Sequence, residues 1–368
     1  MQQPAHGGNL AWAAALAGCP RDAILDFSAS ISPLGPPDSA IAAIQSQIGS
    51  LRHYPEPEYS ELRLALSHFH QLPPEWILPG NGSAELLTLV GRELAELSAT
   101  ILLTPAFGDY YRTLTAYNAK VLEFPINLGQ GDKETRRQNE VFLPPTPQPL
   151  PPSSLTKQYG LLLNNPHNPT GKMFSRQEIL PLLEEFALVV VDEAFMDFVP
   201  PEAEQSLISV VQEHKNLVVL RSLTKFYSLP GLRLGYAIAH PDHLSRWQTW
   251  RDPWPVNNLA AAAAIAVISD QNFQQQTWQW LPPTRNQLFQ GLAAIPGLQP
   301  YTSAANFLLV QSQKSSLQLQ QQLLQHHQIL IRDCLSFKEL GDRFFRIAVR
   351  SVSDNQRLLT ALQALLNN

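Results

Sequence analysis

The sequence contains little cysteine, and this scarcity bears on where the protein works. Its 368 residues include only two cysteines, Cys19 and Cys334, which are far apart and do not follow a metal-ligand spacing. Free thiols are typical of a reducing compartment, so we expect a cytoplasmic protein. The first residues lack a basic segment followed by an apolar stretch, and we therefore expect no signal peptide.

Long apolar runs and clusters of positive charge are also missing. The longest apolar run covers residues 259–268, which is too short to cross a bilayer, so we expect no membrane partner. The net charge is −5 and no basic run occurs, so we expect no nucleic-acid partner either. A hydrophobic content of 44% in a chain of this length is typical of a globular protein with one large domain and a smaller one.

Short apolar runs alternate with helix-like segments along the sequence. This alternation predicts an α/β fold, in which helices cover a mostly parallel central sheet in a large domain beside a smaller α+β domain. A polar, proline-rich segment at 129–154 is expected to form an irregular surface excursion. The expected strands cover residues 100–103, 120–124, 160–163, 188–191, 217–220 and 233–239, and, in the small domain, 307–310, 329–331 and 344–349.

The domain boundaries follow from composition. Two prolines, Pro253 and Pro255, precede an alanine-rich stretch at 258–268, which we interpret as a helix leading into the second domain. The loop-rich start of the chain is expected to pack on that second domain. The assignment is an N-terminal segment at 1–45, a large domain at 46–257, and a linker helix with the small domain at 258–368.

Lys225 is the most informative candidate residue. It follows the apolar run at 217–220, so its primary amine is expected at the end of a buried strand. Two hydroxyl residues, Ser222 and Thr224, precede it, and Arg233 follows eight residues later. An amine can bond the carbon of an aldehyde while hydroxyls and a guanidinium hold a phosphate. The segment therefore suits a covalent imine to a phosphorylated aldehyde.

Other polar clusters also follow expected strands, where open α/β sheets bind their ligands. Asp192 ends an apolar strand and needs a cationic partner there. Asp192 either pairs with the protonated nitrogen of a pyridine ring, or it caps a helix or forms a structural ion pair. Asn168 lies in a proline- and glycine-rich run at 164–171, which is either a rigid turn holding an amide against a ring hydroxyl or simply a turn.

A turn of small residues precedes the helix-like stretch at 86–94. Its backbone N–H groups either bind a phosphate, helped by the helix dipole, or belong to an ordinary capped helix. Two aromatic residues, Phe107 and Tyr110, follow another expected strand and either cover a flat ring or pack in the core. The small residues of the turn are Gly82, Ser83 and Ala84.

The expected second domain contains three candidate arginines, Arg332, Arg346 and Arg350. Alternation along the strand at 344–349 places Arg346 and Arg350 on one face. Two guanidinium groups on one face repel unless an anion lies between them. The pattern therefore favours a bound carboxylate or phosphate over a solvated face.

Taken together and in this order, the clusters resemble the class I and II aminotransferase superfamily of pyridoxal-phosphate enzymes, fold type I, over nearly the whole chain. The resemblance implies that Lys225 forms an imine with pyridoxal 5′-phosphate and that Asp192 pairs with the ring nitrogen. It implies that Asn168 bonds the ring hydroxyl. It also implies a homodimer with shared active sites, because Tyr54 matches the tyrosine that reaches the partner subunit's cofactor phosphate. The residues implied to hold the phosphate are Ser222, Thr224 and Arg233, with the backbone of Gly82, Ser83 and Ala84.

Two stretches depart from the family pattern. Phe195 follows an Asp-Glu-Ala motif where a tyrosine is usual, so a hydroxyl that would donate to the ring oxygen is missing. Asn168 is then expected to be the main partner of that oxygen. Ser30 and Ser32 stand where asparagines are common in relatives.

Two groups within the superfamily are most similar to the chain. The histidinol-phosphate aminotransferases share the motifs at 54–57 and 331–333. The threonine-phosphate decarboxylases of cobalamin biosynthesis share these motifs and resemble the chain more closely at four places, which are 6–9, 26–29 with 33–37, 331–334 and 349–350. The greater similarity to the decarboxylases implies conversion of L-threonine O-3-phosphate to (R)-1-amino-2-propanol O-2-phosphate. The alternative is a histidinol-phosphate aminotransferase in histidine biosynthesis.

A non-catalytic regulatory protein of the same fold is a third hypothesis. Such proteins carry a DNA-binding segment, for which the sequence shows neither room nor charge, and the intact Lys225 also argues against it. We therefore expect a small phosphorylated amino acid as the substrate. The residues expected to contact it are His6, Gly8, Ser32, Asn168, Arg332, Arg346 and Arg350, although a histidine near a chain end is more often solvated.

Overall fold

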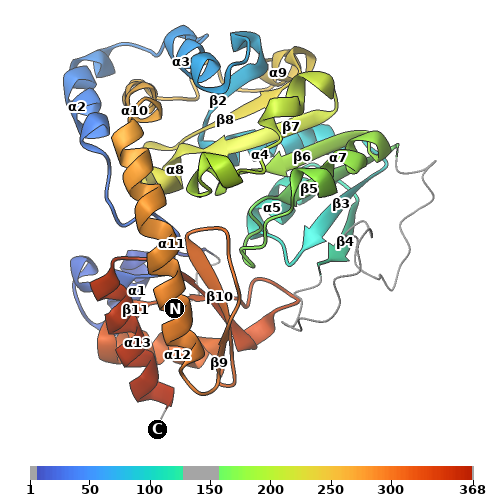
Figure 1. Cartoon of the computed structure of the whole chain (residues 1–368). Helices are drawn as coiled ribbons and strands as arrows, with labels where there is room; N and C mark the ends of the chain where they lie inside the picture. Colours follow the sequence, from blue (N-terminus) through green and yellow to red (C-terminus); the bar gives the residue numbers. More distant parts are fainter. Residues whose placement is uncertain (1–5, 127–156, 367–368) are drawn as a thin grey trace.

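A seven-stranded sheet forms the centre of the structure, a computed structural model that describes residues 6–126 and 157–366 (Figure 1). The surface excursion expected at 129–154 lies outside the described residues. The strands are β2 (Ile77–Asn81), β3 (Ala99–Thr104), β4 (Val121–Pro125), β5 (Tyr159–Asn164), β6 (Leu188–Asp192), β7 (Leu217–Ser222) and β8 (Leu234–Ala239). Their order is β2-β8-β7-β6-β5-β3-β4, and every neighbouring pair is parallel except the two that involve β8. The mostly parallel central sheet is thereby confirmed.

Helices cover both faces of this sheet. One face packs against α4 (Gly82–Leu94), α5 (Gly108–Ala116) and α9 (Pro241–Gln248), and the other against α3 (Ser60–His70), α7 (Arg176–Glu185) and α10 (Asn258–Ile268). The middle strands β6 and β7 are buried along their whole length and consist of leucine and β-branched valine up to their polar ends. Continuous apolar runs of this kind are typical of strands covered on both faces.

A four-stranded antiparallel sheet forms the core of the smaller part. It consists of β9 (Leu298–Pro300), β10 (Phe307–Ser312), β12 (Arg332–Asp333) and β13 (Phe344–Ala348), in the order β12-β13-β10-β9. The helices α11 (Gln271–Ala293), α12 (Ser316–His327) and α13 (Val352–Leu366) contact it or one another. α11 follows α10 and runs from the large sheet to the small one (Figure 1).

The start of the described chain packs on both parts. α1 (Leu10–Ala17) contacts α12, and β1 (Leu25–Asp26) pairs in parallel with β11 (Ile329–Leu330). α2 (Asp38–Gln47) instead packs along α10. A four-residue helix, α8 (Leu223–Phe226), directly follows β7. The segment at 6–31 thus reaches the junction between the two sheets.

Most expected strands are present, with three differences of detail. The strand expected at 329–331 is the two-residue β11, and the chain passes through Ile331 into β12, an unpredicted strand that belongs to a different sheet. The strand expected at 233–239 begins one residue later, since Arg233 adopts a left-handed conformation (φ 58°). The sequence did not predict β1, β2 or β9. In the part of the chain that the structure describes, no helix is long and apolar enough to cross a membrane.

Candidate active site

A cavity of about 220 Å³ lies where the carboxyl ends of β5 and β6 meet the start of α4 and the turn of α8. Residues from the small sheet and from the segment at 6–31 close its other sides. The cavity therefore combines residues that are more than 300 positions apart in the sequence. Of the predicted site residues, those lining it are His6, Ser83, Phe107, Tyr110, Asn168, Asp192, Lys225, Arg332 and Arg346.

Lys225 occupies the short helix α8, so its position is fixed by the buried strand before it. Its Nζ donates a hydrogen bond to Thr224 Oγ1 at 3.3 Å, and Thr224 Oγ1 lies 2.8 Å from Ser222 Oγ. Burial lowers the pKa of the Lys225 amine to about 8, and the nearby carboxylate of Asp192 opposes this effect. An amine that loses its proton near neutral pH can act as a nucleophile.

The carboxylate of Asp192 lies at the end of β6 and accepts hydrogen bonds from two protein groups. Tyr110 donates from its hydroxyl to Asp192 Oδ2 at 2.7 Å, and the backbone N–H of Ala194 donates to Oδ1 at 3.0 Å. Burial raises the pKa of Asp192, while the bond from Tyr110 and the charge of Lys225 lower it. A cationic group in the cavity would favour the ionised carboxylate, because an opposite charge offsets the cost of burial.

Asn168 is held by neighbours from three parts of the chain. Its backbone N–H donates to Asn164 Oδ1 at 2.5 Å, and Asn164 Nδ2 donates to the backbone oxygen of Asp192 at 2.8 Å. Its side-chain oxygen accepts a hydrogen bond from Arg346. The amide oxygen is thus engaged by the small sheet, and the amide NH₂ is the group that can donate to a ligand.

The start of α4 forms a backbone cradle opposite Arg233. Gly82 has φ +71°, and a Cβ built on it would lie 2.5 Å from Arg233 Nη2. Asn81 precedes the helix and makes no side-chain cap. Free N–H groups at a helix start beside a guanidinium suit a phosphate group. The predicted phosphate-binding residues Gly82 and Arg233 therefore lie together, although neither lines the cavity itself.

Aromatic rings form one wall of the cavity. The Phe107 ring packs edge-on against Tyr110 at a centroid distance of 5.7 Å, and the His6 ring lies 5.7 Å from Phe107. Phe195 is buried, and its ring lies 5.4 Å from Lys225 Nζ. Such rings can cover the face of a flat ligand by offset stacking.

Arg332 and Arg346 form the positive side of the cavity. They lie directly opposite each other on β12 and β13, and both are buried. Burial, together with the positive charge of Arg332, lowers the pKa of Arg346 to about 10. Arg332 donates to Ser336 Oγ at 2.6 Å. Two buried guanidinium groups side by side on a cavity wall suit a ligand that carries anionic groups.

Of the residues expected to contact the substrate, Gly8, Ser32 and Arg350 lie outside the cavity lining. Arg350 is beyond the end of β13, where it pairs with Asp354 at 3.1 Å instead of facing the same anion as Arg346. Gly8 donates its N–H to Ser28 Oγ, and Ser32 donates its N–H to the backbone oxygen of Lys225, so both support residues that line the cavity.

Tyr54 is the most distant of the predicted residues. Its side chain is 77% exposed and stacks on Trp254, beside an open groove of about 840 Å³ along α10. Nothing within the described chain connects it to the cavity. Its predicted role depends on a second subunit.

Several cavity residues were not predicted from the sequence. Ser28 and Asn164 lie within motifs that were noted, so the signal existed, but no role was assigned to them. Ser336 and Phe337 come from the loop after β12 and carry no local signal, because only the fold brings this loop to the cavity. Ser30 Oγ is buried without a hydrogen-bond partner at the cavity wall. Among the described residues, no group of acidic, histidine or cysteine side chains is arranged to hold a metal ion.

Comparison with known proteins gives consistent matches over almost the whole chain. The family described as aminotransferase class I and II matches residues 22–365. The threonine-phosphate decarboxylase of Salmonella typhimurium is 37% identical over 98% of this chain and 96% of its own length. The histidinol-phosphate aminotransferase 1 of Nostoc sp. is 32% identical over 94% of this chain and 92% of its own length.

A solved structure also shares the fold. The histidinol-phosphate aminotransferase from Clostridium acetobutylicum superposes with a TM-score of 0.81 at 25% identity, over 94% of this chain and 100% of that one. The agreement covers both the large and the small sheet.

Proposed function

Because the chain belongs to the aminotransferase class I and II family, we propose that it is an enzyme that decarboxylates L-threonine O-3-phosphate. The proposed product is (R)-1-amino-2-propanol O-2-phosphate, and the proposed setting is cobalamin biosynthesis. The threonine-phosphate decarboxylase that matches the chain at 37% identity supports this choice. The observation that carries it is the cavity in which Lys225 and Asp192 face two buried arginines.

Pyridoxal 5′-phosphate is the cofactor of this family, and the residues of the cavity fit it. The Lys225 amine has a lowered pKa, as an imine-forming amine requires. The buried Asp192 carboxylate suits a protonated ring nitrogen. Gly82 approaches Arg233 so closely that a side chain at position 82 would not fit. The backbone N–H groups there and the guanidinium are suitable donors to a phosphate.

The two arginines support a substrate with two anionic groups. Arg346 is joined to Asn168, which lies in the loop after β5, so we assign it to the substrate carboxylate near the reacting carbon. Arg332 lies toward Ser336 and the loop after β12, so we assign it to the substrate phosphate together with His6. An amino acid with a phosphorylated side chain carries both groups, and guanidinium pairs are well matched to each.

The side chains divide the remaining work. Bound pyridoxal phosphate supplies an electron sink for the electron pair left when a bond to the substrate Cα breaks. The carboxylate of Asp192 would stabilise the positive charge on the protonated ring nitrogen. When the bond between Cα and the carboxylate breaks and CO₂ leaves, Lys225 is placed to return a proton to Cα. The aromatic wall of Phe107 and Phe195 excludes water from this step.

Histidinol-phosphate aminotransferase is the second candidate, since a relative of that name is 32% identical over 94% of the chain. It would use the same cofactor residues and the same two arginines. The difference lies in where Lys225 delivers the proton. Delivery to Cα after loss of CO₂ completes a decarboxylation, whereas delivery to the cofactor carbon completes half of a transamination.

The decisive experiment compares the two reactions on purified, cofactor-loaded protein. We expect an absorbance band at ~410–430 nm and release of CO₂ from L-threonine O-3-phosphate, both lost in Lys225→Ala. A Lys314→Ala variant, which removes a lysine that bonds the end of α13, is the matched control and should retain both. Formation of glutamate from histidinol phosphate and 2-oxoglutarate, without CO₂ from threonine phosphate, would establish the aminotransferase instead.

A further inference from the structure

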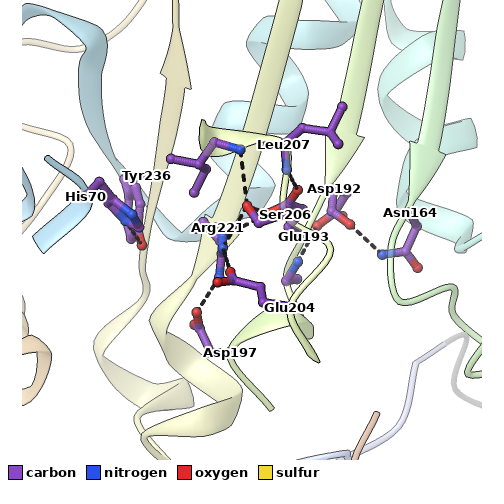
Figure 2. A network of polar contacts seen from close by, with 12 residues as sticks. His70, Asn164, Asp192, Glu193, Asp197, Glu204, Ser206, Leu207, Arg221 and Tyr236 are labelled. Atoms are coloured by element: carbon purple, nitrogen blue, oxygen red, sulfur yellow. Dashed lines mark hydrogen bonds and ion pairs between the residues drawn. The ribbon is translucent and has the colours of Figure 1, made fainter. Parts of the chain in front are cut away.

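Arg221 is a buried charge that the proposed reaction does not use. Its side chain is 3% exposed, and it meets three carboxylates at the end of β7 (Figure 2). Nε lies 3.0 Å from Glu193 Oε2, Nη2 donates to Glu204 Oε1 at 2.7 Å, and Nη1 donates to Asp197. Together with Ser206 these residues are called the Arg221 cluster below.

The cluster fixes Glu193 through both of its carboxylate oxygens. Ser206 donates to Glu193 Oε2 at 2.6 Å, and the backbone N–H of Leu207 donates to Oε1 at 2.8 Å. Ser206 Oγ in turn accepts from Arg221 Nη2 at 3.0 Å. Glu193 is fully buried, so these contacts leave its side chain a single orientation.

The position of the cluster relates it to the active site. Glu193 directly follows Asp192, and Arg221 directly precedes Ser222. The backbone N–H of Glu193 donates to the backbone oxygen of Leu220 at 2.8 Å, which joins the two strand ends. Successive side chains point to opposite faces of a sheet. The side chains of Asp192 and Ser222 therefore lie on the cofactor side of the sheet. Those of Glu193 and Arg221 lie on the opposite side, where their ion pair joins the same two strand ends.

The cluster also restrains the turn that carries Lys225. Trp278 on α11 donates from its indole N–H to the backbone oxygen of Asp197 at 2.8 Å. The Trp278 ring lies 6.1 Å from that of Phe226, the residue after Lys225. α11 therefore braces both the cluster and the far side of α8.

Charge explains why an arginine is needed in this place. One guanidinium faces three carboxylates, and burial raises the pKa of both Glu193, to about 7, and Asp197. A planar guanidinium can donate hydrogen bonds to Asp197 and Glu204 while its Nε lies beside Glu193 in an ion pair. A lysine would keep the charge but could not maintain these directions.

We propose that Arg221 is a positioning residue for the cofactor, which holds Asp192 and the Ser222–Lys225 segment in register through Glu193, Asp197 and Glu204. The proposal rests on the cofactor site of the proposed function and holds for either of its two reactions. Arg221 acts on the cofactor only through these residues, since it does not line the cavity.

The test uses Arg221→Lys, which retains the buried positive charge and so favours folding. We expect the dissociation constant of pyridoxal phosphate, measured by absorbance titration of the cofactor-free protein, to rise roughly ten- to a hundred-fold. We also expect a changed circular dichroism signal in the cofactor band and a lower kcat with KM nearly unchanged. Glu204→Gln, at the partly exposed edge of the cluster, should shift the same quantities less.

Arg285→Lys is the control for a purely structural effect. Arg285 is a partly buried arginine on α11 that bonds the backbone oxygen of Ala305, away from the cluster. The Arg285→Lys substitution should lower Tm without changing the cofactor dissociation constant or the circular dichroism band. A wild-type dissociation constant, band and kcat in Arg221→Lys would overturn the proposal, whatever its Tm. A normal cofactor band without CO₂ release or transamination would contradict only the proposed reactions.

Discussion

Lys225 and Asp192 show how single residues acquire reactivity from their surroundings. Asp192 ends one strand that is buried along its whole length and Lys225 lies just after another, and each is desolvated by that position. Burial disfavours the charged form of both groups, while their mutual attraction favours it. A lysine and an aspartate on the protein surface would have neither property.

The lowered pKa of Lys225 predicts a pH dependence of stability in the cofactor-free protein. The folded state releases the proton near pH 8 and the unfolded state near pH 10.5. Between these values the unfolded state binds more protons, so the free energy of unfolding should rise with pH. Below pH 8 the protonated Lys225 amine is buried, and it lowers the free energy of unfolding by an amount that does not change with pH.

Urea unfolding of the wild type and of Lys225→Met checks this prediction. At pH 7 the variant should have the higher free energy of unfolding, and the difference between the two proteins should be smaller at pH 9.5. The same gap at both pH values would show that burial does not shift the titration of this amine.

The arginines allow a prediction about which side chains contact the substrate. Arg332 lines the cavity and Arg350 does not, although both come from the same part of the sequence. Arg332→Lys should raise KM for threonine phosphate by roughly ten-fold, because a charge-assisted hydrogen bond is lost. Arg350→Lys is the matched control and should leave KM unchanged. Steady-state CO₂ release measures both, and equal effects of the two substitutions would contradict the assignment.

The position of a residue at the cavity could be predicted from the sequence where a local motif marks it. Lys225, Asp192 and Asn168 each follow a recognisable strand or turn, and the structure brings them to one cavity. Ser336 and Phe337 could not be found in this way, because their contribution depends on how the small sheet docks. The prediction that Arg350 shares a face with Arg346 extended strict alternation past Ala348, the last residue of β13, and the ion pair of Arg350 with Asp354 has no signal in that pattern.

At the scale of elements, the start of α4 is the most constrained piece of backbone near the site. Gly82 has a positive φ, and a methyl group there would contact the Arg233 guanidinium. Gly82→Ala should therefore lower the free energy of unfolding by about 1–2 kcal/mol and weaken cofactor binding. Gly231→Ala is the control, because a Cβ at that position has open space around it.

Thermal unfolding and cofactor titration of the two variants together check this prediction. Loss of stability without loss of cofactor affinity in Gly82→Ala would remove the start of α4 from the phosphate site. Equal behaviour of both glycine variants would show that the close approach to Arg233 has no effect.

The elements that sequence analysis missed have identifiable causes. β2 contains Pro79 and Gly80, which usually mark turns and not strands. The apolar run through Ile331 continues without a break while the chain passes from one sheet to another. Local periodicity reports burial, and it cannot report which partner strand provides that burial.

At the scale of the whole molecule, the position of Tyr54 predicts that the active site needs a second chain. Tyr54 is exposed beside the open groove along α10 and does not line the cavity of its own chain. We expect a homodimer in sedimentation experiments. Mixing Tyr54→Ala protein with Lys225→Ala protein should restore up to about a quarter of wild-type activity, since only mixed dimers contain one intact site.

The same mixture gives its own control. Each variant measured alone should be inactive or nearly so, and cross-linking subunits before mixing should prevent recovery. No recovery in a mixture that demonstrably exchanges subunits would show that Tyr54 does not serve the partner's site.

The pairing of β1 with β11 has a consequence for how the protein is made. Residues 25–27 bond to residues 328–330, and the backbone oxygen of Phe27 also accepts from the N–H of Ala348. The wall formed by His6 and Ser28 therefore depends on strands that come much later in the chain. A ribosome releases the early residues long before the late ones. A nascent chain therefore contains Lys225 before this wall can form, and the cavity can close only after residues 328–348 have been synthesised.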